Sequence, residues 1–234
     1  MKLNLFSLLG ITPPEFTLPD GLTVTAHTAC EGADDNTLES ISRGAAAGAD
    51  IVEIDLHFLP DNTPVLKHDA PTASEAGKLP TMESALELLS TLNVRMNIDV
   101  KSTADMLAVA ALAEKYNVKD KVFFTGVEEK DTEAVRTGAP GIPYYLNVKI
   151  DKKKNADPAY ISSLVEKVKA CGAIGINAKY TGCSKKLINA FRKEGIPVSL
   201  WTANTKKAMY RCLALEPDNI TTRFPSVLCG IIKK

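Results

Sequence analysis

The sequence predicts an α/β fold, a TIM-type (β/α)8 barrel whose parallel strands are covered by helices. Short apolar stretches alternate with amphipathic ones over about 200 residues, the pattern of a parallel sheet packed against helices. Strand-like stretches such as VSLW at 198–201 are almost continuously apolar, as expected for strands buried on both faces. No glycine-rich dinucleotide fingerprint follows the first of them, which favours a barrel over a doubly wound nucleotide-binding fold.

The expected strands number one more than an eight-stranded barrel uses. They are 22–26, 51–56, 65–67, 94–100, 122–125, 144–148, 173–177, 198–202 and 219–221. The second and third leave no room for a helix between them, so we expect an irregularity at this point of the barrel.

Several helices have recognisable ends. Pro158 in a first turn and Gly172 after a last turn enclose one helix, and Ser184 begins the next. Asn36, followed three residues later by Glu39, resembles a capping box and predicts the start of an earlier helix.

Length and composition indicate one soluble, globular domain over residues 1–234. The chain has 28 basic and 28 acidic residues, so its net charge attracts neither nucleic acid nor an anionic membrane. A small-molecule substrate is therefore the expected partner. The surface composition predicts no particular oligomeric state.

The cysteines and the N-terminus predict a cytoplasmic protein. Five cysteines are scattered without metal-ligand spacing, which is typical of reduced thiols. The first sixteen residues, MKLNLFSLLGITPPEF, have an apolar stretch too short for a secretory signal or a membrane span.

Polar residues collect where the expected strands end, which is where barrel enzymes carry their chemistry. In chain order they are His27, Glu53 and Asp55, His68, Asp99 and Lys101, and Trp201. Taken singly, each has an ordinary structural explanation, such as a hydrogen-bonded histidine or a packed tryptophan. Their occurrence at consecutive strand ends predicts a functional site.

The two acids of the second strand point to a metal. Side chains two residues apart on a strand share a face, so Glu53 and Asp55 lie together, as do Asp99 and Lys101. Buried carboxylates need compensating charge, and one divalent ion such as Mg²⁺ or Ca²⁺ prefers oxygen ligands. Ion pairs of these acids with Lys101 or Lys67 are the structural alternative.

Several motifs resemble the glycerophosphodiester phosphodiesterase family in content and order. The first are His27-Thr28, the segment DDNT at 34–37, EID at 53–55 and HD at 68–69. LPTMESALELL at 79–89, NIDVKS at 97–102, IPVSLWTAN at 196–204 and PDNITTRFP at 217–225 follow. The resemblance covers about residues 22–228.

The resemblance implies a barrel of the phospholipase-C-like phosphodiesterase type that hydrolyses glycerophosphodiesters to sn-glycerol 3-phosphate and an alcohol. By position, His27 and His68 would be the general acid–base pair. The metal would be held by Glu53, Asp55 and Asp99. Lys101 would bind the phosphate, and Trp201 would line the substrate pocket.

The chain departs from the family pattern at several places. Thr28 stands where the family has arginine, and Asp99 where it has glutamate. Arg223 stands where the family often has aspartate; we assign it no role, although it could supply the missing positive charge if it faces the mouth of the barrel. The short segment 70–80 replaces a longer capping insertion, which predicts a more open pocket. His57 shares the face of the acids, but we expect it beyond the strand end and exposed.

Two alternatives remain beside this function. One is a related phosphodiesterase acting on lysophospholipids or sphingomyelin, a group that also has a first histidine without arginine. The other is a non-catalytic barrel that binds phosphodiesters. Retention of both histidines and all three acids disfavours the second.

Overall fold

The computed structural model of the chain describes residues 18–232. The N-terminal stretch 1–16, for which neither a secretory signal nor a membrane span was expected, lies outside these residues. Among the described residues, no helix combines the length and the apolar character needed to cross a bilayer.

The described residues alternate strands and helices as expected. The strands are β1 (Thr23–Ala26), β2 (Ile51–Phe58), β3 (Pro64–Leu66), β4 (Arg95–Val100), β5 (Val122–Val127), β6 (Tyr144–Val148), β7 (Gly175–Lys179), β8 (Val198–Trp201) and β9 (Asn219–Thr222). The helices are α2 (Leu38–Ala46), α3 (Met82–Thr91), α4 (Met106–Lys115), α5 (Thr132–Gly138), α6 (Pro158–Cys171), α7 (Lys185–Lys193), α8 (Lys206–Leu213) and α9 (Pro225–Ile232).

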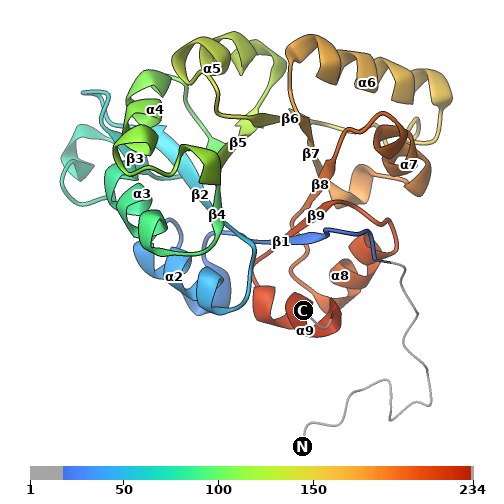
Figure 1. Cartoon of the computed structure of the whole chain (residues 1–234), viewed down its shortest axis with the longest axis horizontal. Coiled ribbons are helices and arrows are strands. Elements are labelled where there is room, and N and C mark those ends of the chain that lie inside the picture. The colour runs from blue at the N-terminus through green and yellow to red at the C-terminus, as the bar shows by residue number, and fades with distance from the viewer. Residues whose placement is uncertain (1–17, 233–234) are drawn as a thin grey trace, which may run out of the picture.

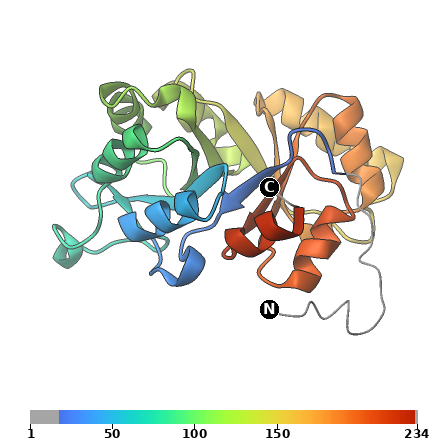
Figure 2. The ribbon, with the colours of Figure 1, turned by 60° about the horizontal axis from the view of Figure 1, so that its bottom comes forward.

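The sheet closes into the predicted parallel barrel. Its strand order is β1-β9-β8-β7-β6-β5-β4-β2, and β1 also pairs with β2, which completes the circle. Figure 1 shows the helices as a ring outside the strands, and Figure 2 shows the same arrangement after a rotation. The expected irregularity is β3, which runs antiparallel to the end of β2 and stays outside the circle.

Alternation along the strands separates an apolar outer layer from a polar interior. In β2, Val52, Ile54 and Leu56 are buried in the apolar layer beneath the helices. Glu53 and Asp55 alternate with them and face the interior, where only 5% and 4% of each residue is exposed. The two-residue period of a strand thus directs both acids into the barrel.

Stacked side chains lie at the amino ends of β4, β5 and β6. The Arg95 guanidinium lies 4.8 Å from the centre of the Phe123 ring, and that ring is 5.5 Å from the ring of Tyr145. Gly175 makes room for Tyr145, because a Cβ there would lie 2.5 Å from a tyrosine ring carbon. The cavity of the barrel lies at the opposite, carboxyl ends of the strands.

Two local expectations were wrong. β2 continues two residues further than expected because β3 pairs with its end, so His57 lies within the strand and is half-buried instead of exposed. The cap of α2 is Thr37, whose hydroxyl accepts a hydrogen bond from the Ser40 N–H at 3.1 Å. Asn36 makes different contacts, and Glu39 pairs with Arg43 one turn later instead of capping.

Candidate active site

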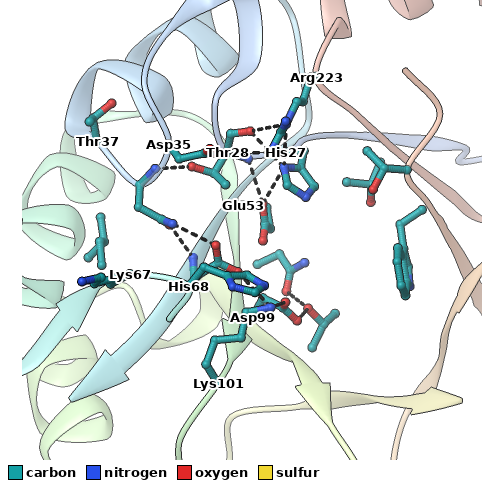
Figure 3. Close-up of a pocket in the computed structure, with 18 of the residues that line it drawn as sticks. His27, Thr28, Asp35, Thr37, Glu53, Lys67, His68, Asp99, Lys101 and Arg223 are labelled. Carbon is teal, nitrogen blue, oxygen red and sulfur yellow. Dashed lines mark hydrogen bonds and ion pairs between the residues drawn. The ribbon is translucent and has the colours of Figure 1, made fainter. Parts of the chain in front are cut away.

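A cavity of about 760 Å³ lies at the carboxyl ends of the strands and is lined by every predicted site residue. These are His27, Glu53, Asp55, His68, Asp99, Lys101 and Trp201. Figure 3 shows a close-up of it, with both histidines, two of the acids and Lys101 labelled. Barrel closure brings together side chains that are up to 174 positions apart, from His27 to Trp201.

Glu53, Asp55 and Asp99, named here the acidic cluster, have carboxylate oxygens within 4.8 Å of one another. Asp55 and Asp99 are register partners on β2 and β4, and Glu53 lies on the same face as Asp55. Three carboxylates at this spacing fit a hard divalent cation, which takes oxygen ligands. The donor set therefore suits a divalent ion such as Mg²⁺ or Ca²⁺.

Ionisation of Glu53 carries a large electrostatic penalty. Burial raises the pKa of its carboxyl well above the usual value, and the charges of Asp55 and Asp99 act in the same direction. The Thr28 N–H donates to Glu53 Oε2 at 2.8 Å and partly offsets this effect. Ionisation of a buried carboxyl is costly when the group stands alone, and it becomes favourable when a cation lies beside the group.

Asp55 is held by Asn36, which was expected to cap helix α2. The Asn36 amide donates to Asp55 Oδ2 at 2.8 Å, and Asn36 Oδ1 accepts from the Asp55 N–H at 2.8 Å. Asn36 has a left-handed backbone, with φ of 58°, which asparagine tolerates better than most residues. The sequence contains one indication of this role. Thr37, one position later, can cap the helix by itself, which leaves the Asn36 side chain available for another contact.

Lys101 bridges the other two carboxylates of the acidic cluster, those of Asp55 and Asp99. Its Nζ lies 3.1 Å from Asp55 Oδ1 and 2.5 Å from Asp99 Oδ2. Burial acts to lower the Lys101 pKa, but the two carboxylates outweigh it and raise the pKa. The ion-pair alternative is thus realised for Lys101. Lys67, in contrast, pairs with Glu75 and not with the cluster.

His27 is held beside Glu53. Its Nδ1 lies 2.9 Å from the Thr28 carbonyl oxygen and 3.7 Å from Glu53 Oε2. A ring protonated at Nδ1 donates to that carbonyl and leaves Nε2 as the proton acceptor. Burial lowers the His27 pKa, so the neutral form is favoured at pH 7.

His68 is the more open of the two histidines, with 67% of its side chain exposed. Its Nδ1 lies 2.8 Å from Asp69 Oδ1. In the view of Figure 3, Glu53 lies between the two histidine rings. Two imidazoles are therefore presented to one cavity, each with Nδ1 oriented by a neighbour.

Trp201 and Arg223 complete the lining. The indole N–H of Trp201 is buried and has no hydrogen-bond partner among the described residues. Arg223, to which no role was assigned, enters the cavity from the end of β9, and its Nε lies 3.2 Å from the Thr28 carbonyl oxygen. Arg223 was assigned no role from the sequence, because β9 and β1 become neighbours only when the barrel closes.

Comparison with known proteins agrees with this geometry. The model of the glycerophosphoryl diester phosphodiesterase family matches residues 23–97 and 71–227, nearly all of the chain. The chain belongs to this family. It is a phosphodiesterase, as the motifs indicated.

The following relatives are distant in sequence but cover about nine tenths of this chain. A glycerophosphodiester phosphodiesterase from Caldanaerobacter subterraneus is 22% identical over 90% of this chain and 98% of its own. A solved glycerophosphodiester phosphodiesterase from Parabacteroides distasonis has a TM-score of 0.74 at 19% identity, covering 91% and 97% of the two chains. A phosphodiesterase from Oleispira antarctica, solved with the product sn-glycerol-3-phosphate, has a TM-score of 0.72 at 18% identity, covering 93% and 98%. These structures establish the barrel fold.

Proposed function

We propose that this phosphodiesterase hydrolyses glycerophosphodiesters to sn-glycerol 3-phosphate and an alcohol with the help of one divalent metal ion. The observation that carries the proposal is the acidic cluster, three carboxylates within 4.8 Å that face a cavity shared with two histidines. The family supplies the reaction class, and the product named for the Oleispira structure supports the glycerol phosphate part of the substrate.

The metal would be held by Glu53, Asp55 and Asp99. A bound divalent ion supplies positive charge at the phosphoryl oxygens, which hydrolysis of a diester monoanion requires. Mg²⁺ and Ca²⁺ both accept such a ligand set, and the two differ in size and in coordination number. Asp99 is shorter than the family glutamate, and its Oδ1 lies 2.8 Å from the Thr125 hydroxyl, which orients it.

The two histidines would move the protons. His27, neutral because burial lowers its pKa, is suited to accept a proton from the attacking hydroxyl at Nε2. His68, exposed and oriented by Asp69, is suited to donate a proton to the leaving alkoxide. Lys101 would stabilise the phosphate, and Trp201 would form an apolar wall for the substrate.

The decisive experiment measures release of sn-glycerol 3-phosphate from glycerophosphocholine and glycerophosphoethanolamine with Mg²⁺, Ca²⁺, Mn²⁺ or EDTA. We expect metal-dependent release that His27→Ala and Glu53→Ala each reduce by at least about a hundredfold. His57→Ala is the matched control, because His57 is a half-buried histidine of the same strand as Glu53 that does not line the cavity. It should keep nearly full activity.

The same assay separates the alternatives. Metal binding without release from either diester would contradict the proposed substrate. Release of choline from lysophosphatidylcholine or sphingomyelin would then establish the lipid-directed enzyme. Binding without any turnover would establish a non-catalytic barrel.

A further inference from the structure

The cationic side chains that line the cavity differ in how far they are already neutralised. Among the described lining residues other than histidine, they are Lys67, Lys101 and Arg223. Lys101 bridges two carboxylates of the acidic cluster, and Lys67 is paired with Glu75. Lys67 is already held by Glu75, and Lys101 would share its charge between a bound phosphate and the two carboxylates.

Arg223 has donors to spare. Its Nε donates to the Thr28 carbonyl oxygen at 3.2 Å, and its Nη2 donates to Asp35 Oδ1 at 3.1 Å. A guanidinium group has five N–H donors, and Nη1 has no partner among the described residues. Asp35 is 58% exposed at its side chain, so water weakens this single ion pair.

The position of Arg223 is fixed by its backbone. The Arg223 N–H donates to Asn204 Oδ1 at 2.9 Å, and its carbonyl oxygen accepts from the Glu31 N–H at 3.0 Å. These contacts attach the loop after β9 to the loops after β8 and β1. A guanidinium held in this way loses little conformational freedom when it binds an anion.

The guanidinium also lies beside the proposed acid–base chemistry. Its Nε is 3.4 Å from His27 Nδ1, and both groups approach the same Thr28 carbonyl oxygen. Figure 3 shows Arg223 next to His27 and Thr28, on the opposite side of His27 from Glu53 in this view. The Thr28 side chain is buried, and its hydroxyl accepts from the Asn36 N–H, so position 28 offers an incoming anion no charge.

We propose that Arg223 binds a non-bridging phosphate oxygen of the substrate, so that the cavity receives its phosphate-binding arginine from the end of β9. A planar guanidinium matches two phosphate oxygens by paired N–H···O bonds, and charged hydrogen bonds of this kind are the strong ones. The inference rests on the proposed function, because a phosphodiester must occupy the cavity. It adds a substrate-binding residue that the motifs did not assign.

The competing explanation is that Arg223 only ties the loops after β1 and β9 together through Thr28 and Asp35. Removing a purely structural contact would lower the folding stability. Removing a binding residue would lower the affinity of the folded protein for phosphate. Arg43 provides a matched control on helix α2. It is 42% exposed at its side chain, compared with 38% for Arg223, and it also donates to one carboxylate and one carbonyl oxygen. It does not line the cavity.

The test compares Arg223→Gln, Arg223→Lys and Arg43→Gln with the wild type. Binding of sn-glycerol 3-phosphate and of inorganic phosphate is measured by calorimetry with metal present, and KM and kcat are measured on glycerophosphocholine. We expect Arg223→Gln to weaken both ligands and to raise KM by roughly ten- to a hundredfold. The affinity of Arg223→Lys should lie between those of Arg223→Gln and the wild type, because lysine keeps the positive charge but cannot form the paired hydrogen bonds of a guanidinium. Arg43→Gln should match the wild type.

Asp35→Asn adds an independent check, since it removes the carboxylate that competes for Arg223. It should tighten phosphate binding or leave it unchanged. Equal affinity of Arg223→Gln and wild type would overturn the inference, as would a loss in Asp35→Asn as large as in Arg223→Gln. If the wild type releases no sn-glycerol 3-phosphate but Arg223→Gln still weakens phosphate binding, the proposed function fails and the phosphate site stands.

Discussion

Asn36 holds Asp55 through two hydrogen bonds, one to the carboxylate and one from the backbone N–H, each of 2.8 Å. Both residues are buried, with 6% and 4% exposure, and one precedes helix α2 while the other lies in β2. The contact fixes the orientation of a proposed metal ligand. Partners of this kind influence metal affinity nearly as much as some ligands do.

Asn36→Gly is expected to weaken metal binding by about ten- to a hundredfold, because Asp55 loses its orienting amide. Glycine accepts the left-handed backbone of residue 36, where φ is 58°, so strain is not introduced. Asn117→Gly is the control, since Asn117 is an exposed residue with φ of 55°. Calorimetric titration with Mn²⁺ measures both, and an unchanged affinity in Asn36→Gly would assign Asn36 to folding alone.

Glu53→Gln is expected to stabilise the metal-free protein. The folded-state pKa of Glu53 is raised above 4.5, so the folded protein binds this proton more tightly than the unfolded chain. Stability without metal therefore falls as pH rises above 4.5 toward the folded-state pKa, and the cost persists at neutral pH. Glutamine removes this cost, which we place at about 1–4 kcal/mol.

Thermal unfolding at neutral pH in EDTA and in excess metal measures this effect. In EDTA the Glu53→Gln protein should melt higher than the wild type. With metal the order should reverse, because the wild type gains binding energy that the variant lacks. A lower melting temperature for the variant in EDTA would contradict the assigned penalty.

The acid limb of kcat/KM should have its midpoint below pH 6.5. Burial lowers the pKa of His27, the Thr28 carbonyl acts to raise it, and the positive charge of Arg223 lowers it further. A proton acceptor with a depressed pKa stays active at lower pH. Arg223→Gln removes one depressing charge, so its acid limb should move to higher pH. Profiles from about pH 5 to 8 measure both, and a limb that does not move would belong to another group.

Gly126→Ala should destabilise the protein by about 2–4 kcal/mol and weaken metal binding. Gly126 has φ of +75°, and a Cβ there would collide with the Val100 carbonyl oxygen and lie 2.7 Å from Asp99 Oδ1. The pairing of β5 with β6 shifts register around this residue.

Gly77→Ala is the matched control for that prediction. Gly77 has φ of +72° but nothing lies within 4 Å of the added carbon, so it should lose only about 1 kcal/mol. Denaturant unfolding measures both variants, and equal losses would show that backbone conformation alone requires Gly126.

Local sequence patterns predicted most of the fold. Pro158 and Gly172 mark the ends of α6 as expected, because proline and glycine constrain the backbone by their own covalent structure. The short gap between the second and third strands predicted an irregularity, and the structure shows it to be β3, which lies outside the barrel. The end of β2 was misjudged, because pairing with β3 extends it through His57, and such pairing depends on a second segment.

Within the site, the sequence by itself determined which side chains share a face. The two-residue period of a strand directs Glu53 and Asp55 to one side, and the carboxyl ends of parallel strands meet at one edge. These rules act over a few residues, or follow from the direction of strands, so a linear pattern contains them.

Only the tertiary structure decided which residues hold that site in shape. Asn36 was expected to cap a helix but instead contacts Asp55. Arg223 lies beside His27, although the two are 196 positions apart in the sequence. Arg223 and His27 meet because β9 pairs with β1, and Asn36 and Asp55 meet beside the pairing of β1 with β2. Barrel closure fixes distances between segments that no local pattern relates, and short-range electrostatics and hydrogen bonds then select their partners.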